Sequence, residues 1–274
     1  MHPASLRWSR WSRWSRWSRW PLLRELIRRE LTSRYLGTFS GGLWALAQPL
    51  LQLAIYGYVF TYVFRARLPA DEFGDVGFLP FLALGLWPWN AFAESLNRST
   101  TVMADNAGLL GKIAVPRALL VAAPVLAGFL LQAAGFVLVL LVLWAGGWLP
   151  LHANAVFVPV LFVCLMLFTL GLAWFFSAIA VFVRDVAQAV PQLLLLLFFL
   201  TPVLYPRSLI PESLQFLSDF NPMALFIGLF RQCLLGFGPY GLAHVAGLGV
   251  VTLVMAWMGY RTFQRLSPHF EDFL

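Results

Sequence analysis

Residues that could act as acids, bases or nucleophiles are dispersed along the 274-residue chain. The four histidines lie far apart, at positions 2, 152, 244 and 269, and no histidine or carboxylate pair recurs at helical spacing within one apolar stretch. Cys164 and Cys233 have no CxxC partner, so we interpret both as packing residues and expect no metal site. The sequence contains no GxxxxGK(S/T) phosphate loop. The chain alone is therefore not expected to be an enzyme, and any ATP would be hydrolysed by another polypeptide.

Composition indicates a membrane protein. Hydrophobic residues make up 60% of the chain and charged residues 11%, whereas an ordinary soluble domain is about a quarter charged. The formal net charge of +7 belongs largely to one end, because nine of the nineteen basic residues lie between Arg7 and Arg34. A basic charge confined to one terminus beside apolar stretches does not indicate a nucleic-acid-binding domain.

Six apolar stretches are long enough to cross a bilayer, which takes about 20 residues per helix. They are residues 43–64, 78–103, 114–144, 155–182, 186–205 and 241–262. Their continuous apolar character favours helices over the alternating strands of a membrane barrel. The second is interrupted by Trp87-Pro88-Trp89-Asn90 and Glu94, so we expect it to be kinked or partly lined by protein. The sequence thus predicts an all-α protein with six transmembrane helices.

Basic residues near the span ends predict the orientation. With six spans, the arginine-rich N-terminus, the second and fourth connections and the C-terminal tail fall on one side, which is then cytoplasmic. The opposite connections are poor in net positive charge. We therefore expect a multi-pass membrane protein with both termini in the cytoplasm, and no cleaved signal peptide before the first span.

Residues 7–20 repeat a Trp-Ser-Arg triplet, "RWSRWSRWSRWSRW". Residues three apart on an α-helix are separated by about 300°, so these tryptophans would wind around the axis without forming one stripe. Two interpretations stand: a low-complexity tail over residues 1–21, or an interfacial anchor with Trp at headgroup depth and Arg facing anionic lipid. A tail held this close to a bilayer would meet lipid first, so we do not expect it to bind nucleic acid.

The following segment, residues 22–36, predicts an amphipathic helix on the cytoplasmic surface. Pro21 stands at its start, and Gly37 follows its end. Leucines and isoleucine recur at three- and four-residue spacings, and the basic residues Arg24, Arg28, Arg29 and Arg34 lie largely on the other faces. Glu25–Arg29 and Glu30–Arg34 are spaced as i,i+4 ion pairs. Simple anchoring to membrane lipid would explain this helix without further function.

Two connections contain more than a simple loop. After the second span, Glu94 and Arg98 are spaced as a structural ion pair, and a short helix with Leu109, Leu110 and Ile113 could dock a cytoplasmic partner. After the fifth span, two apolar segments at about 208–219 and 222–236 are too short to cross the membrane. Four prolines break this region, which predicts two re-entrant or interfacial helices before the last span.

These motifs together resemble a known family. "PWNAFAESLNRST", "NAGLLGKIAVPRALL", "VRDVAQAVPQLLLLLFFLTPVLYP" and "FNPMALFIGLFRQCLLG" occur in the order seen in the permease subunits of bacterial ABC transporters that export O-antigen, teichoic acid or capsular polysaccharide. The resemblance runs from about Leu22 to the C-terminus. The Trp-Ser-Arg repeat lies outside it.

The resemblance implies an architecture and partners. Residues 22–36 would be a cytoplasmic gate helix, 37–262 the six-span domain and 263–274 a cytoplasmic tail, and the two short segments after Pro206 would be periplasmic gate helices. Two copies of the chain would enclose a conduit, with two ATPase subunits that bind ATP and Mg. The chain itself would carry no cofactor. Its substrate would be a lipid-linked polysaccharide.

The resemblance also implies roles for three sets of residues. Arg24, Arg28, Arg29 and Arg34 would meet the substrate pyrophosphate or anionic lipid headgroups. The coupling helix at 104–115 would contact the ATPase through Asp105, Asn106, Leu109, Leu110, Lys112 and Ile113. Aromatic faces suit a sugar conduit, so candidate lining residues are Tyr56, Phe60 and Phe64, their neighbours Tyr58 and Tyr62, and the polar Gln188 and Gln192. Helix packing or an interfacial belt would explain the aromatic stripes equally well.

Three alternative functions belong to other classes. An ABC exporter of a small molecule or drug would share the architecture and differ in its conduit. A membrane-embedded glycan transferase would need a catalytic acid or histidine cluster, which the sequence does not display. A structural scaffold would not depend on an ATPase partner.

Overall fold

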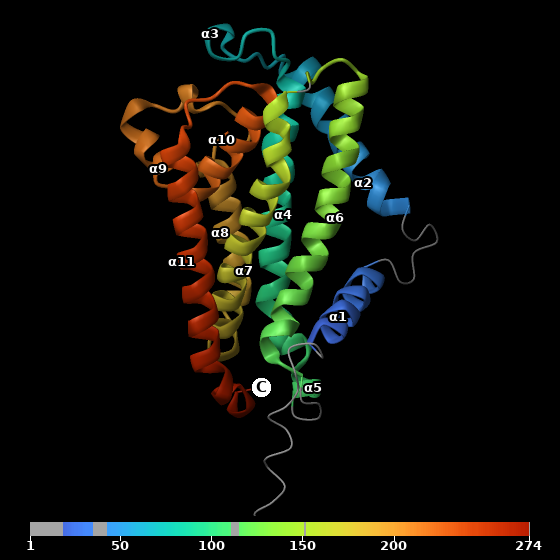
Figure 1. Cartoon of the computed structure of the whole chain (residues 1–274), viewed down its shortest axis with the longest axis vertical. Coiled ribbons are helices and arrows are strands. Elements are labelled where there is room, and N and C mark those ends of the chain that lie inside the picture. The colour runs from blue at the N-terminus through green and yellow to red at the C-terminus, as the bar shows by residue number, and fades with distance from the viewer. Residues whose placement is uncertain (1–18, 35–42, 111–114, 151, 274) are drawn as a thin grey trace, which may run out of the picture.

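The computed structural model describes residues 19–34, 43–110, 115–150 and 152–273, and over these ranges the chain is helical with no strand. The N-terminal repeat up to residue 18, residues 35–36 and Gly37 lie outside the described residues. Figure 1 shows long helices side by side in one bundle. The helices before the third long span are α1 Arg19–Ser33, α2 Leu43–Tyr58, the π-helical η3 Val59–Val63, α3 Ala70–Phe73, α4 Phe78–Asp105 and α5 Ala107–Leu110.

The second half of the chain completes the bundle. Its elements are α6 Arg117–Ala145, η4 Ala153–Phe157, α7 Val158–Phe182, α8 Val186–Leu200, η5 Arg207–Leu209, η6 Glu212–Leu214, α9 Gln215–Asp219, α10 Pro222–Leu235, α11 Leu242–Leu266 and η7 Ser267–Asp272. In Figure 1, α5 and η7 lie at one end of the bundle, and α3 and α9 lie at the other. We refer to these as the α5 end and the α9 end.

Helix α4 is the centre of the bundle. It packs against α6, α7, α10, α8 and α2, and the side chains of Trp87, Trp89 and Phe92 are buried along it. Asn90 donates a hydrogen bond to Gln52 of α2 at 3.3 Å. The helix continues through Pro88. Its polar and proline-containing middle is therefore surrounded by protein, as the interrupted apolar pattern predicts.

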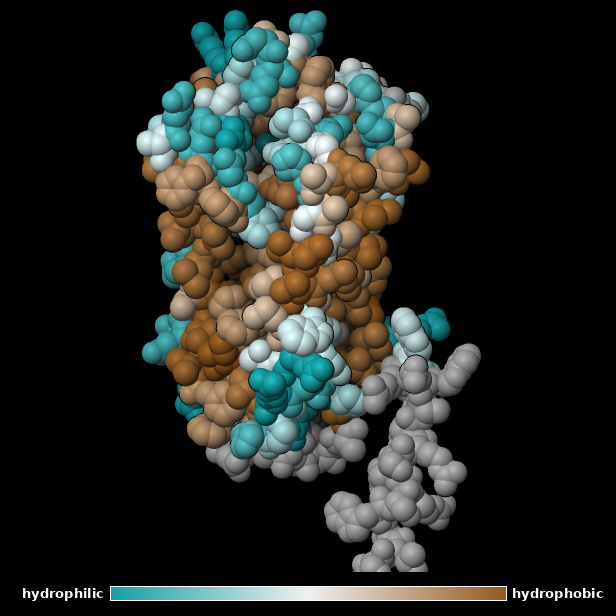
Figure 2. Space-filling model, turned by 60° about the vertical axis from the view of Figure 1, so that its left-hand side comes forward, coloured by the Kyte–Doolittle hydropathy of each residue, from teal (hydrophilic) through white to brown (hydrophobic). Residues whose placement is uncertain are grey.

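Three helices are long and apolar enough to cross a membrane: Arg117–Ala145, Ala153–Phe182 and Leu242–Phe270. They confirm the predicted stretches 114–144, 155–182 and 241–262 as helices. Figure 2 shows a band of hydrophobic side chains around the middle of the molecule, with polar residues gathered toward both ends. The described part of the chain is thus a helical membrane protein with these apolar spans.

The α7–α11 contact is the closest backbone approach for which a glycine is required. A Cβ atom on Gly171 would lie 2.5 Å from the Met255 carbonyl oxygen, and one on Gly259 would collide with the Gly171 carbonyl. Small residues let two membrane helices touch through their backbones, which increases dispersion contact where no hydrophobic effect drives association. This contact fixes the last span against the fourth predicted one.

The boundaries of three predicted elements differ from the structure. The stretch 186–205 is wrong at its C-terminal side, because α8 ends at Leu200 before Pro202. The single helix predicted at 208–219 is divided into η5, η6 and α9, since Pro211 interrupts it. Helix α1 begins at Arg19, so Pro21 stands inside its first turn and not at its first residue. The 222–236 segment is confirmed as α10, which ends at Gly236 in the left-handed conformation, with φ of 80°.

Asn221 links the C-terminal end of α8 to the start of α10 by hydrogen bonds. Its side chain caps α10 by accepting from the Met223 N–H at 2.9 Å, and its amide donates to the Thr201 hydroxyl at 2.8 Å. We expect Asn221→Ala to lower the free energy of unfolding by about 2 kcal/mol, because it removes an N-cap and a second hydrogen bond. Asn221→Ser keeps a capping oxygen and should recover about half. Thermal unfolding of the purified protein measures both, and equal losses would contradict the capping role.

Candidate functional site

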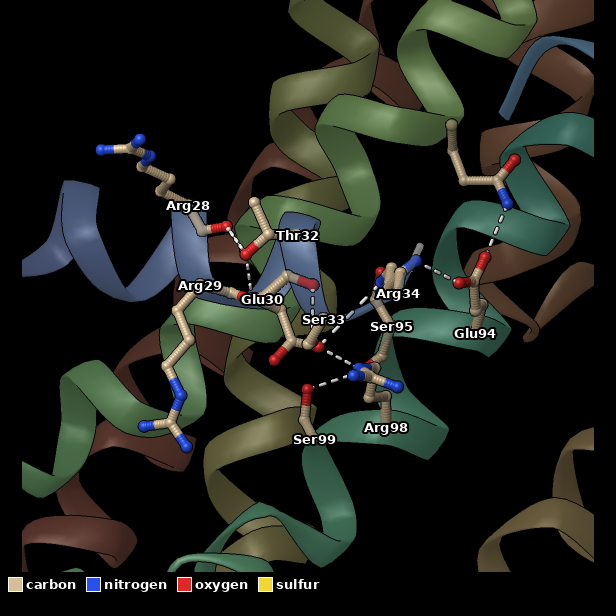
Figure 3. A network of polar contacts seen from close by, with 11 residues as sticks. Arg28, Arg29, Glu30, Thr32, Ser33, Arg34, Glu94, Ser95, Arg98 and Ser99 are labelled. Atoms are coloured by element: carbon tan, nitrogen blue, oxygen red, sulfur yellow. Dashed lines mark hydrogen bonds and ion pairs between the residues drawn. The ribbon is translucent and has the colours of Figure 1, made fainter. Parts of the chain in front are cut away.

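Helix α1 is held to the bundle by two ion pairs with α4. The Arg34 guanidinium donates to the Glu94 carboxylate, and the Arg98 guanidinium donates to the Glu30 carboxylate. Gln132 of α6 donates to the other Glu94 oxygen at 2.7 Å. Figure 3 shows these side chains converging between the two helices. We call Glu30, Arg34, Glu94 and Arg98 the gate quartet.

The gate quartet is more buried than an ordinary surface ion pair. The side chains of Arg34 and Glu30 are only 10% and 19% exposed, while those of Glu94 and Arg98 are 43% and 44% exposed. Arg34 Nε also lies 4.0 Å from Glu30, the predicted i,i+4 partner. Partial burial reduces screening by water but also removes hydration from the charges, so the net contribution of each pair stays at about 0.2–1 kcal/mol, the range typical of an exposed pair. Removing one partner costs more, because it leaves the more buried charge uncompensated.

The predicted Glu94–Arg98 pair is wrong. Both residues stand on α4 at the expected spacing, but each forms its ion pair with α1 instead of with its neighbour. Helix α1 packs on α6, and this places Glu30 of α1 and Arg34, just after α1, within reach of α4, so the charged groups that meet come from different segments. Sequence spacing identified all four residues, as the pairs Glu30–Arg34 and Glu94–Arg98, but it missed the pairing between the two segments.

The four predicted arginines of α1 have different environments. Arg24, Arg28 and Arg29 are exposed, whereas Arg34 is partly buried and paired with carboxylates. Figure 3 shows the Arg28 and Arg29 side chains extending away from the gate quartet. The exposed arginines present surface for an anionic headgroup, whereas Arg34 donates to Glu94 through Nη1 and its buried Nε and Nη2 have no hydrogen-bond partner.

A polar cavity of about 550 Å³ lies between α1, α4 and α6 beside the gate quartet. Its polar lining includes Arg29, Glu30, Glu94, Asn97, Arg98, Thr101 and Asp105. Three of these are carboxylates and two are guanidinium groups, so the lining is not basic while the gate quartet is paired. A phosphate group here would meet the exposed Arg29, and it gains a second guanidinium only if it takes Arg98 over from Glu30.

A groove of about 630 Å³ on the outside of α2 adjoins Arg34. Trp44, Gln48, Gln52 and Tyr56 line it together with Arg34. One predicted conduit residue, Tyr56, therefore shares a surface hollow with one predicted headgroup residue. One candidate from each set thus lines the same groove along α2.

The aromatic stripes of the first predicted span form two ring series. Tyr56, Phe60 and Phe64 follow one another with ring centroids 6.3 and 5.5 Å apart, and Tyr58 lies 6.0 Å from Tyr62. Tyr58, Tyr62 and Phe64 are exposed, whereas Tyr56 and Phe60 are half-buried. The second stripe thus presents its rings outward from α2, as a lining surface or a helix interface requires.

The predicted glutamines lie on another helix. Gln188 and Gln192 are both exposed on α8, which packs on α4 as α2 does. Exposed amides on an otherwise apolar helix favour a wet surface or contact with another protein chain.

The α5 end assembles the predicted coupling residues. Asp105 closes α4 and accepts from the Thr101 hydroxyl at 2.9 Å, and the Asn106 amide donates to the Val102 carbonyl at 2.8 Å. Helix α5 contains Leu109 and Leu110, whereas Lys112 and Ile113 lie outside the described residues. Figure 1 places α5 at the extreme end of the bundle, where a partner could reach it.

The α5 end also brings distant segments together. A hollow of about 350 Å³ is lined by Met103 and Ala107, by Arg184 and Ala187 at the start of α8, and by Phe273 near the C-terminus. The Phe273 ring contacts Phe182 at 4.8 Å. The C-terminal residues therefore pack beneath α7 beside the predicted coupling segment.

No group of three or more metal-ligating His, Cys, Asp or Glu side chains occurs in the part of the chain that the structure describes. The chemistry of the described site is thus one of ion pairing, hydrogen bonding and helix contact.

The model of the ABC-2 type transporter family matches residues 21–235. The chain belongs to this family. It is accordingly the membrane subunit of a transporter and not an enzyme. The matched range begins in α1 and ends with α10, so it includes the gate quartet and the coupling segment.

Curated relatives cover nearly the whole ABC-2 chain. It is 30% identical over 253 residues to the O-antigen export system permease protein RfbA of Myxococcus xanthus, with 92% of this chain and 94% of the relative covered. It is 27% identical over 253 residues to the protein of the same name from Klebsiella pneumoniae, with 92% and 95% covered. The polysialic acid transport protein KpsM of Escherichia coli is 27% identical over 241 residues, with 86% and 91% covered.

Sequence reasoning missed one buried charge in this ABC-2 protein. Arg231 of α10 is only 6% exposed and donates to the carbonyls of Phe81, Pro202 and Val203 at 3.1, 2.7 and 2.6 Å. Its guanidinium carbon also lies 3.5 Å from the Phe81 ring centroid. An arginine isolated in the apolar run "LFIGLFRQCLLG" was the available signal. Its partners lie 28 to 150 residues away, so spacing could not identify them.

Proposed function

We propose that the chain is the membrane subunit of an ATP-driven exporter that moves a lipid-linked polysaccharide, of the O-antigen type, across the bacterial inner membrane. The observation that carries this proposal is the similarity over 92% of the chain to two proteins named as O-antigen export permeases. The KpsM relative, named for polysialic acid transport, supports the same substrate class. A homodimer of the chain would work with two ATPase subunits, which bind ATP and Mg because this sequence has no phosphate loop.

The proposed membrane topology has six spans: α2 with η3, α4, α6, α7, α8 and α11. The α5 end, with both termini, would be cytoplasmic, and the α9 end would face the periplasm, with α10 re-entrant. The excess of arginine near α1 and in the connections at the α5 end supports this orientation. Helices α2, α4 and α8 are less apolar or shorter than ordinary spans, which fits helices that face protein or a conduit.

In this proposal α1 acts as the cytoplasmic gate. The gate quartet holds α1 against the bundle, which closes the gate. The substrate pyrophosphate enters past Arg24, Arg28 and Arg29 toward the groove on α2. Its oxygens can replace the Glu94 carboxylate on Arg34, because both are anions that accept in-plane guanidinium hydrogen bonds. The glycan would then follow the exposed rings of α2 and the amides of α8.

Co-purification from the native membrane tests the partner assignment. We expect an ATPase with a phosphate-loop motif to be recovered with the chain, and to be lost when Leu109, Leu110 and Ile113 are changed to glutamate, because a charged surface cannot pack in an apolar docking site. Phe220→Glu is the matched control, since Phe220 is 86% exposed at the opposite end.

The control variant should retain the ATPase. Recovery of a folded chain with no ATPase would contradict the exporter, and an ATPase retained by the triple variant would contradict the coupling role of α5. Export of a lipid-linked glycan by the purified complex separates the proposal from a small-molecule exporter.

A further inference from the structure

A further cavity lies at the α9 end of the bundle, and it shares no lining residue with the gate quartet. Its volume is about 420 Å³, within the range of small-ligand sites. It lies among α3, α10, η5 and the loop after α10, and its lining includes Glu72, Phe73, Phe81, Arg207, Arg231, Phe237 and Tyr240. Aromatic walls with a few charged groups distinguish this cavity from the polar one beside α1.

Arg231 forms a fixed donor at the inner side of this cavity. Its three hydrogen bonds to the Phe81, Pro202 and Val203 carbonyls use three of the five guanidinium N–H groups. The remaining N–H groups belong to a side chain that is only 6% exposed and already locked in place. A ligand oxygen that accepts from this guanidinium gains a charge-assisted hydrogen bond. Little conformational entropy is lost, because the side chain is already fixed.

Tyr240 is the second fixed polar group of the lining. The Gln232 side chain holds its backbone from both directions, donating to the Tyr240 carbonyl at 2.8 Å and accepting from its N–H at 2.9 Å. Its ring lies against α10 at Gly228, where any Cβ would collide with it. Burial raises the pKa of the Tyr240 phenol, so the hydroxyl keeps its proton and can donate at neutral pH.

Two further polar groups are likewise held by neighbours. Arg207 donates to both oxygens of Asp219 at 2.8 Å, and the Ser208 hydroxyl donates to Glu72 at 2.6 Å. Two guanidinium groups, Arg207 and Arg231, and one carboxylate, Glu72, line the cavity, and Asp219 pairs with Arg207 from outside the lining. With Asp219 included the formal charges cancel, and Glu72 would repel a phosphate dianion.

A series of rings connects the cavity with α2. Phe78 stacks on Phe60 with centroids 5.2 Å apart and lies 6.0 Å from Phe81, the ring beneath Arg231. Phe73 meets Phe81 edge to face at 5.2 Å. The cavity thus stands at the end of the aromatic series that begins with Tyr56 and Phe60.

We propose that this cavity binds one uncharged hexose unit of the exported glycan at the α9 end. The proposal rests on the function proposed above. Aromatic faces pack on the C–H face of a pyranose, the fixed Arg231 and Tyr240 donors meet hydroxyl oxygens, and Glu72 accepts from a hydroxyl. Preorganised polar groups in an aromatic cavity of zero net charge favour a neutral polyol over an anion.

Ligand-observed saturation-transfer NMR on the purified permease–ATPase complex in nanodiscs tests the proposal. The probes are the methyl glycosides of glucose, galactose and mannose, with inorganic phosphate as the charged competitor. We expect at least one glycoside to bind, and Tyr240→Phe and Glu72→Ala each to weaken it about three- to tenfold, because each removes one polar contact. Tyr260→Phe on the exposed side of α11 is the matched control and should leave binding unchanged.

The outcomes separate this inference from the proposed function. Binding that Tyr240→Phe and Glu72→Ala leave unchanged, displacement by phosphate, or no binding of any glycoside would overturn the hexose site. If the same complex still exports a lipid-linked glycan, the exporter stands without the site. If glycosides bind in the predicted way but no glycan is exported, the substrate assignment falls and the cavity remains a sugar site.

Discussion

Arg231→Lys should lower the free energy of unfolding by about 4 kcal/mol, and Arg231→Met by about 2 kcal/mol. The apparently conservative change is the more harmful one. Lysine cannot reach the Phe81, Pro202 and Val203 carbonyls together, so its charge would stay buried with fewer partners or its proton would be lost. Methionine leaves the same carbonyls without a donor, but it also removes the cost of burying a charge.

Thermal unfolding of the purified chain in one detergent measures both variants. Arg207→Lys is the matched control, because the Arg207 side chain is 46% exposed and its pair with Asp219 is accessible to water. It should shift the midpoint little. If Arg231→Lys were as stable as the parent, or more stable than Arg231→Met, the three carbonyl hydrogen bonds would not be what holds the end of α8 to α10.

The spans that the sequence predicted best are those whose environment is uniform. Helices α6, α7 and α11 are apolar on every side, so composition alone locates them within a few residues. Helix α8 is different, because its end depends on Pro202 and on carbonyls that Arg231 satisfies from another helix. An apolar pattern that continues through Val203 and Leu204 cannot reveal where the backbone hydrogen bonds stop.

The candidate site was predictable as a set of residues but not as a set of contacts. Amphipathic spacing indicated α1 and its arginines, and an i,i+4 pattern singled out Glu94 and Arg98. Which carboxylate meets which guanidinium depends on how α1 lies on α6 beside α4, and this is a tertiary property. The same limit applies to the α9-end cavity, whose polar groups come from residues between 72 and 240.

The cross-helix pairs make the attachment of α1 a measurable equilibrium. Glu30→Arg places three guanidinium groups together with Arg34 and Arg98, so we expect α1 to detach with a free-energy change of about 2 kcal/mol. A cysteine at Leu26, which packs against the core, should then react with a maleimide about 30-fold faster in a background with Cys164 and Cys233 replaced by alanine.

The reversed pair is the decisive control for a direct contact. Arg98→Glu alone should also release α1, because Glu30 then faces a carboxylate, whereas Glu30→Arg with Arg98→Glu restores opposite charges across the same interface. We expect labelling of the double variant to return to within about threefold of the parent. If the pairs hold the gate of an exporter, glycan export should be lost in each single variant and recovered with α1 docking in the double variant. If docking recovers but export does not, attachment of α1 alone is not sufficient for export. The native arrangement, with glutamate at position 30 and arginine at position 98, would then be needed for the substrate to replace a carboxylate on an arginine.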